Sequence, residues 1–200
     1  MLIEGIKSRP VYASLTPRPG RLHLVVANDE GALALADLAA VAPDGFLART
    51  RIVYVPGGSA GEDHGAQLAS LGAADCVRVA SDAVALATFR AALVDARMGT
   101  QVYAAGTENL IGQVVQAALE AGLELDAIGA EHRGSLERRV QCVHCKGIIE
   151  HVTTQPVTCS GCGLSLLVRD HFSRRIGAFQ GVCIDAEEPG TAPAPEVVFA

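Results

Sequence analysis

The sequence lacks the marks of membrane-spanning and exported proteins. No apolar run reaches the roughly 18 residues that a helix needs to span a membrane. The N-terminus, Met-Leu-Ile-Glu-Gly-Ile-Lys, has neither the basic start nor the sustained apolar stretch of a secretion signal. We therefore expect a cytoplasmic protein with no membrane segment, in a compartment where thiols stay reduced.

Recognisable catalytic groups are also scarce. No serine or cysteine lies in a nucleophile-elbow motif, and no nucleophile–base pair or carboxylate pair stands out. Aromatic residues are only 4% of the chain, and they do not interleave with basic residues as they do in single-stranded nucleic-acid sites. These absences predict a chain that is not catalytic alone, and they argue against nucleic acid as its partner.

The sequence does contain enough apolar residues to fold, and its charge is uneven. Half of the 200 residues are hydrophobic, which is typical of a globular protein with one medium or two small domains. The net charge is −6, but residues 133–175 hold seven Lys and Arg against three Asp and Glu. That segment is +4 and the remainder −10. An acidic body with a basic segment indicates a face that docks an acidic protein.

Four of the six cysteines have the spacing of ligands to one metal ion. They form two pairs, Cys142-x-x-Cys145 and Cys159-x-x-Cys162, with 13 residues between the pairs. Each pair can fold into a knuckle that presents two thiolates, and two knuckles make a closed tetrahedral site. Gly147, Gly161 and Gly163 supply the small residues that such turns need. Two disulfides or four unrelated thiols are the alternatives, and the doubled spacing argues against both.

The spacing leaves the identity of the metal open. Zn²⁺ is favoured, in a structural role, because a closed four-sulfur site in a ribbon is its commonest setting. Iron in a rubredoxin-like site is the alternative and would form a one-electron centre. His144 lies inside the first knuckle and is more typical of a solvent-facing residue than of a ligand. Cys76 and Cys183 have no partner at ligand spacing.

Apolar segments alternate between strand and helix patterns along the first two thirds of the chain. Strands are predicted at 22–27, 51–55, 76–79, 101–105 and 127–131, and helices at 32–41, 66–71, 82–98 and 108–121, with Asp82 as the N-cap of the third helix. This order predicts an α/β fold with a doubly wound, mostly parallel five-stranded sheet. We expect an extended N-terminal arm over 1–20, a Rossmann-like reductase-type domain over 21–137, a small four-cysteine metal ribbon over 138–170 and a docking tail over 171–200.

A doubly wound sheet binds its ligands at the carboxyl ends of the strands, with phosphates against helix N-termini. The loop Asn28–Gly31 carries two carboxylates and one glycine, which makes a poor phosphate cradle. The loop at 56–61 has three glycines but no lysine. The turn at Gly106 and Thr107 is a better ligand edge, so these two residues are the candidates for cofactor binding. Similar turns occur in sheets that bind nothing, which leaves a vestigial edge as the alternative.

Two segments of the first domain resemble reductases. Val102-Tyr-Ala-Ala-Gly106 and the helix after it resemble the Cys/Ala-Gly motif in the pyridine-nucleotide half of ferredoxin reductases. The run from Val25 to Leu33 is similar to a segment of siderophore-interacting reductases. The flavin barrel of such enzymes has no room in residues 1–20, so we do not expect a self-sufficient flavoprotein.

The C-terminal half resembles a more specific family. Its Cys-x-x-Cys pairs, the run Leu167-Val-Arg-Asp-His-Phe-Ser-Arg-Arg175 and the following Gly177-Ala-Phe are similar to the DmmA-type subunit of bacterial dimethylamine monooxygenase. The similarity covers most of residues 20–190. It implies a small accessory or electron-relay subunit of a multi-subunit, NADPH-dependent enzyme that demethylates dimethylamine to methylamine and formaldehyde. NADPH, flavin, an iron–sulfur cluster and an oxygen-activating iron would then lie on partner subunits.

The same run supplies the candidates for partner docking. They are Arg169, His171, Phe172, Arg174 and Arg175. The two adjacent arginines suit carboxylates of a partner subunit, and Phe172 and Phe179 are expected to be exposed anchors beside them. Two other functions stay open. One is a non-enzymatic zinc-ribbon adaptor or scaffold, whose basic face could bind nucleic acid, and the other is a degenerate sensor that binds NADPH.

Overall fold

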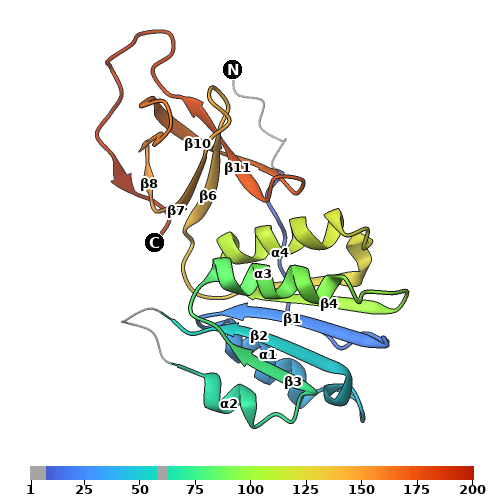
Figure 1. The fold of residues 1–200 in the computed structure, drawn as a ribbon. Coiled ribbons are helices and arrows are strands. Elements are labelled where there is room, and N and C mark those ends of the chain that lie inside the picture. The colour runs from blue at the N-terminus through green and yellow to red at the C-terminus, as the bar shows by residue number, and fades with distance from the viewer. Residues whose placement is uncertain (1–7, 58–62) are drawn as a thin grey trace. The chain divides into compact units, whose positions relative to one another are not determined.

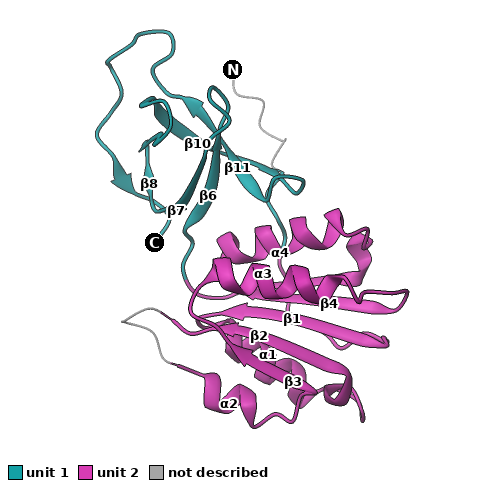
Figure 2. Cartoon of the chain, viewed as in Figure 1, with its two compact units in different colours: residues 1–11, 135–200 teal, residues 12–134 magenta. Residues whose placement is uncertain are grey.

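The computed structural model describes residues 8–57 and 63–200. The chain forms two compact units (Figure 2). Tyr12–Gly134 makes one, and Ser135–Ala200 together with the N-terminal segment through Val11 makes the other. The predicted domain boundary, between 137 and 138, lies three residues from the boundary in the structure.

The first unit is built on a parallel sheet, as the strand pattern predicted (Figure 1). The strand order is β3-β2-β1-β4-β5, and every neighbouring pair is parallel. This order makes the sheet doubly wound, since the chain begins at the central strand and extends in both directions from it. The strands are β1 (Leu22–Asn28), β2 (Thr50–Val55), β3 (Asp75–Arg78), β4 (Thr100–Gly106) and β5 (Ile128–His132).

Helices cover both faces of this sheet. The α-helices are α1 (Gly31–Ala40), α2 (Gly65–Ala69), α3 (Asp82–Leu93) and α4 (Glu108–Glu120), with short 3-10 turns at Leu47–Arg49 and Leu125–Ala127. Successive residues of β1 point to opposite faces. Leu24 and Val26 pack against α3 and α4, and Val25 and Ala27 pack against α1 and α2. Each face of the sheet therefore has its own apolar core.

Helix α3 begins and ends differently from the prediction. Its N-cap is Ser81, whose hydroxyl accepts a hydrogen bond from the N–H of Val84, and Asp82 is already helical. The helix ends at Leu93, five residues before the predicted end at Met98. The Asp82 carboxylate therefore does not cap the helix, and it accepts other hydrogen bonds at this end of the sheet.

The second unit is a mixed sheet in the order β7-β6-β11-β10-β9. Its strands are β6 (Arg138–Cys142), β7 (Ile148–Val152), β9 (Val157–Thr158), β10 (Ser165–Ser173) and β11 (Ala178–Cys183), and β8 (Thr154–Gln155) pairs with β12 (Glu196–Val197). Strand β11 lies at the centre, parallel to β6 and antiparallel to β10. This unit follows the first, as predicted, and contains all four cysteines of the two pairs.

The predicted docking tail over 171–200 is wrong as a separate element. Residues 178–183 form the central strand of the sheet, where Phe179 is only 1% exposed, and Phe199 lies in the same apolar core. The predicted arm over 1–20 is not separate either. Leu15 is buried in the core of the first unit, and Ser8 makes a bridge with His171 in the second. Contacts between residues distant in the sequence incorporate these segments, and no local pattern reveals such contacts.

In the described parts of the chain, none of the helices combines the length and the apolar character that crossing a membrane requires.

Candidate metal centre

Two turns with the same hydrogen-bond pattern carry the four cysteines. In the first, the N–H of Cys142 donates to the carbonyl of Gly147, and the N–H of Lys146 donates to the carbonyl of Cys142, both at 2.9 Å. The second turn, over residues 159–164, repeats both bonds at 2.8 and 2.9 Å. The residue after the second cysteine has a left-handed backbone in each, with φ of 64° at Lys146 and 75° at Gly163. The two pairs therefore fold as matched knuckles.

The four sulfurs converge on one point. All four Sγ atoms lie within 4.8 Å of one another. The Sγ–Sγ distance is 3.8 Å between Cys142 and Cys162 and 3.6 Å between Cys145 and Cys159. Metal–sulfur bonds of about 2.3 Å in a tetrahedron hold sulfurs about 3.8 Å apart. A disulfide needs about 2.05 Å, so these thiols are not paired as disulfides. The residues fit a single metal ion, and a tetrahedral four-sulfur set serves both zinc and iron.

Two glycines leave room for the sulfurs, as the sequence predicted. A Cβ atom at Gly161 would lie 3.2 Å from the sulfur of Cys145 and 3.9 Å from that of Cys159. A Cβ at Gly147 would lie 3.2 Å from the sulfur of Cys145, and the N–H of Gly147 donates to that sulfur at 3.4 Å. The knuckles therefore surround the sulfurs closely, and a backbone donor stabilises the charged form of one thiolate.

The sulfurs also shift one another's acidity. Burial raises the pKa of Cys159, but the N–H groups of Cys162 and Gly161 outweigh it and lower this pKa to about 7. The N–H of Leu164 lowers the pKa of Cys162, but burial and the other three sulfurs raise it to about 12. One thiolate thus forms readily, and the later ones form against its charge. A dication supplies the positive charge that holds four thiolates together.

The remaining cysteines and the knuckle histidine lie outside this sulfur group. His144 is exposed in the first knuckle. The thiol of Cys183 donates to a carboxylate oxygen of Asp185 at 3.3 Å, which raises the pKa of the thiol. Cys76 lies on β3 and packs against the core of the first unit. Sequence spacing therefore separated the four converging thiols from the other two.

The predicted docking residues lie on β10 and the turn that follows it. Arg169, His171, Arg174 and Arg175 are exposed. Phe172 is half-buried and packs edge-on against Phe179, with ring centroids 5.0 Å apart. The expectation that Phe179 is an exposed anchor is wrong, because this side chain fills the core of the sheet. The exposed surface of this run is thus formed mainly by its three arginines and His171.

The nucleotide candidates lie where β4 meets α4. Gly106 ends β4 with a φ of 128°, and Thr107 caps α4 by accepting a hydrogen bond from the N–H of Leu110 at 3.4 Å. Thr107 is buried, and its N–H donates to the side-chain oxygen of Asn28 at 3.0 Å. Most of the glycine-rich loop at 56–61 lies outside the described residues.

A buried arginine escaped the sequence analysis, which treated it only as part of the basic segment. Arg138 is 4% exposed, and its guanidinium carbon lies 4.2 Å from the ring centres of both Phe179 and Phe199. It also forms an ion pair with Asp170 at 2.9 Å. Its position in the sequence could have indicated that it is buried. Arg138 precedes Val140 by two residues, and alternate residues of a strand such as β6 point to the same face.

The fold and the site together define a two-unit protein, in which a doubly wound α/β unit precedes a mixed-sheet unit with four clustered cysteines that could hold one metal ion. This chain belongs to the dimethylamine monooxygenase subunit DmmA-like family. The N-terminal domain of that family matches residues 4–128 and its C-terminal domain matches residues 139–182. The family resemblance noted in the sequence is confirmed.

A curated relative is the heme-dependent oxidative N-demethylase delta subunit of Ectopseudomonas mendocina (strain ymp). It is 39% identical over 97 residues, which are 48% of this chain and 55% of the relative. The alignment thus spans about half the length of that protein.

Solved structures of reductases overlap the chain in part. The Amycolatopsis cytochrome P450 reductase GcoB is 17% identical with a TM-score of 0.42, covering 56% of this chain and 37% of its own. The ferredoxin reductase of carbazole 1,9a-dioxygenase has the same identity and TM-score, covering 57% of this chain and 34% of its own. The strand order, and not these overlaps, defines the fold.

Proposed function

We propose that this chain is a small accessory subunit of a multi-subunit oxidative N-demethylase and is not catalytic alone. The observation that carries this proposal is the family membership of both units, together with four cysteine sulfurs already placed for one metal ion. The relative in Ectopseudomonas mendocina is named as the delta subunit of such an enzyme, which supports the existence of partner subunits. The reductase-like strand order of the first unit agrees with a place in electron transfer.

The proposed reaction is the NADPH-dependent demethylation of dimethylamine. Dimethylamine, O₂, NADPH and a proton give methylamine, formaldehyde, NADP⁺ and water. One oxygen atom enters the methyl group that is oxidised, the other is reduced to water, and NADPH supplies the two electrons. NADPH, flavin, an iron–sulfur cluster and the oxygen-activating iron lie on partner subunits, and this chain supports their assembly or their electron transfer.

For the metal centre we propose zinc in a structural role. Cys142 and Cys159 are buried, and all four sulfurs lie within 4.8 Å of one another, as in sites that stabilise a fold. Iron is the second candidate, because Cys145 is exposed and offers a sulfur that a redox partner can approach. Iron would supply a one-electron couple, whereas zinc would only cross-link the knuckles.

The metal content of the purified chain decides between these roles. Protein from cells supplied with both metals is expected to contain one zinc ion per chain and to be colourless. This result would assign the centre to stability and assembly. One iron per chain, with visible thiolate charge-transfer bands that bleach on reduction, would contradict the zinc proposal and make the subunit an electron carrier.

Docking to an acidic surface of a partner subunit is proposed for the exposed charges of β10 and its turn. Arg174 and Arg175 extend from the turn, and Arg169 and His171 precede them on the strand. None of these four side chains forms an ion pair within the described residues, so the three guanidinium charges are available to a partner. Phe172 supports the strand from within and stays half-buried.

Reconstitution tests both the function and the docking face. The other subunits are assayed for dimethylamine-dependent formaldehyde production with and without this chain, and the rate is expected to fall when the chain is absent. The double variant Arg174→Glu, Arg175→Glu is expected to weaken assembly by about tenfold or more, because like charges then face each other. Arg21→Glu, an exposed charge reversal in the α/β unit, is the matched control. Equal rates with and without the chain would refute the function.

A further inference from the structure

Parallel sheets of this kind hold a dinucleotide at the carboxyl ends of the strands, where free N–H groups at helix starts bind its phosphates. The structure allows a direct test of whether this edge fits such a ligand. The N–H of Thr107, at the start of α4, donates to the Asn28 side-chain oxygen at 3.0 Å. The amide nitrogen of Asn28 donates back to the Thr107 hydroxyl at 3.1 Å. The Asn28 side-chain oxygen thus accepts the hydrogen bond that the Thr107 N–H would otherwise donate to a ligand oxygen.

Asn28 also fills the space above the glycine of this edge. A Cβ atom at Gly106 would lie 1.9 Å from the Asn28 side-chain oxygen, so that oxygen lies directly against the bare face of the glycine. Asn28 is only 4% exposed. The absence of a side chain at Gly106 therefore makes room for a residue of the same chain, and not for a bound molecule.

The carboxylate of Asp82 also contacts Asn28 at this edge of the sheet. The amide nitrogen of Asn28 lies 3.2 Å from both carboxylate oxygens of Asp82, the first residue of α3. Asn28 therefore links the end of β1 to the starts of α3 and α4. The Asp82 carboxylate places a negative charge at the positive, N-terminal end of the α3 helix dipole. It therefore takes the interaction that a phosphate would make there, and it repels phosphate.

The start of α1 offers no alternative cradle. A Cβ at Gly31 would lie 2.3 Å from the carbonyl oxygen of Ala105, so the first turn of α1 packs directly against the backbone of β4. The N-cap of α1 is Glu30, and Asp29 precedes it. The backbone is therefore packed where dinucleotide-binding sheets need an open glycine turn, and two acidic residues flank this helix start.

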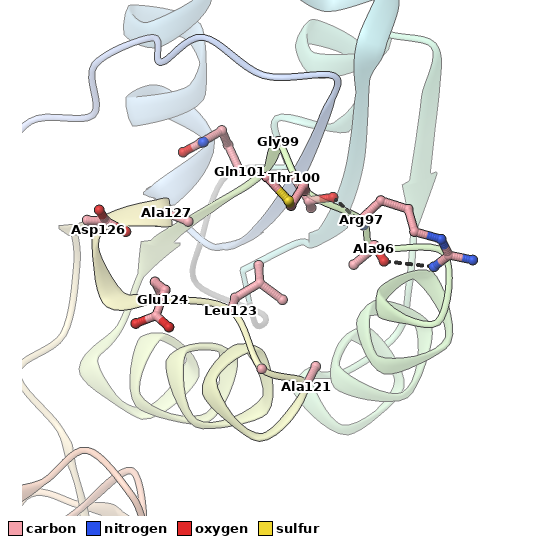
Figure 3. Close-up of a pocket in the computed structure, with 12 residues that line it drawn as sticks. Ala96, Arg97, Gly99, Thr100, Gln101, Ala121, Leu123, Glu124, Asp126 and Ala127 are labelled. Carbon is pink, nitrogen blue, oxygen red and sulfur yellow. Dashed lines mark hydrogen bonds between the residues drawn. The ribbon is translucent and has the colours of Figure 1, made fainter.

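A pocket of about 400 Å³ lies at the opposite end of the sheet (Figure 3). It is lined by the start of β4 and by the chain that follows α3 and α4, whose carbonyl ends carry partial negative charge. Glu124 and Asp126 add two carboxylates, and the Arg97 guanidinium donates to the carbonyls of Val94 and Ala96. This pocket does not suit phosphates and does not replace the closed edge.

We propose that Asn28 is an internal substitute for a ligand at this edge, and that the α/β unit of this subunit does not bind NADPH. The side-chain oxygen of Asn28 occupies the place of a ligand oxygen at Thr107, and its nitrogen joins that site to Asp82. The fold has kept the reductase topology, and the edge at Gly106 and Thr107 is vestigial. The nucleotide that the complex uses binds another subunit.

Two measurements on the intact chain test this inference. Calorimetric titration with NADPH is expected to show no saturable binding up to about 1 mM, a weaker affinity than cofactor enzymes have. Amide hydrogen exchange at Thr107 is expected to be slow in the nucleotide-free chain and at least about tenfold faster in Asn28→Ala, because the acceptor is removed. The amide of Arg133, which donates to the Gly106 carbonyl, is the internal reference and should not change.

The outcomes are distinct. Stoichiometric binding of NADPH by the wild-type chain, with a Kd below about 0.1 mM, would overturn the inference. So would unchanged exchange at Thr107 in a folded Asn28→Ala chain, since Asn28 would then not hold that amide. Binding of NADPH would also contradict the proposed place of this cofactor on a partner subunit. Neither failure would affect the proposed accessory role, which is tested by reconstitution with the partner subunits.

Discussion

Cys159→Ser is expected to release the metal and to unfold the unit formed by Ser135–Ala200, while the α/β unit stays folded. Cys159 is buried next to Leu166, and its sulfur lies 3.6 Å from that of Cys145. Binding of a structural metal contributes about 10–16 kcal/mol in small zinc domains, which matches or exceeds the roughly 5–15 kcal/mol that stabilises a typical domain. Metal analysis and amide exchange, recorded separately for the two units, measure both effects. Assembly with partner subunits is expected to be lost as well.

Cys183→Ser is the matched control. Cys183 lies in the same unit and hydrogen-bonds Asp185, outside the four-sulfur group. This variant is expected to keep one metal ion per chain and to assemble. A Cys159→Ser chain that retains the metal, or that still assembles with its partners, would refute the structural role of the centre.

Local sequence patterns predicted the α/β unit and indicated which four cysteines lie close together. Each buried strand is a short apolar run, and each knuckle lies within six residues, so the signals are contiguous in the chain. The starts of the helices could also be predicted from the sequence, although Ser81, and not Asp82, caps α3. The four cysteines could be separated from Cys76 and Cys183 because ligand spacing is a property of the turn itself.

Features that depend on distant pairing could not be predicted in this way. Strand β11 pairs with β6 through Phe179 and Val140, and nothing near Phe179 indicates that partner. For this reason a central strand was mistaken for a tail. Asn28 and Thr107 are 79 residues apart, and the sequence gives no sign that one closes the binding edge of the other. Such contacts appear only when the strands are placed in order.

The buried cation of the second unit is expected to have the next largest effect on stability. Arg138 lies between the rings of Phe179 and Phe199 and pairs with Asp170, so it attaches the C-terminus to the sheet. Arg138→Ala is expected to lower the free energy of unfolding of this unit by about 3 kcal/mol, because a desolvated cation–π contact contributes about 2 kcal/mol and a cavity adds to the loss. This change is measured by denaturant unfolding that is monitored through hydrogen exchange of the Phe199 amide.

Three comparisons separate the cation from simple packing. Arg138→Met keeps most of the apolar stem but loses the guanidinium, with its charge and its bond to Asp170, so it is expected to lose less stability than Arg138→Ala. Arg169→Ala, an exposed arginine on β10, is expected to stay within about 0.5 kcal/mol of wild type. In a double-mutant cycle, Arg138→Ala and Phe199→Ala are expected to couple by about 1 kcal/mol or more, because one contact is lost in both. Additive effects would show that Arg138 and Phe199 stabilise the unit independently. They would contradict the proposal that Arg138 attaches the C-terminus to the sheet.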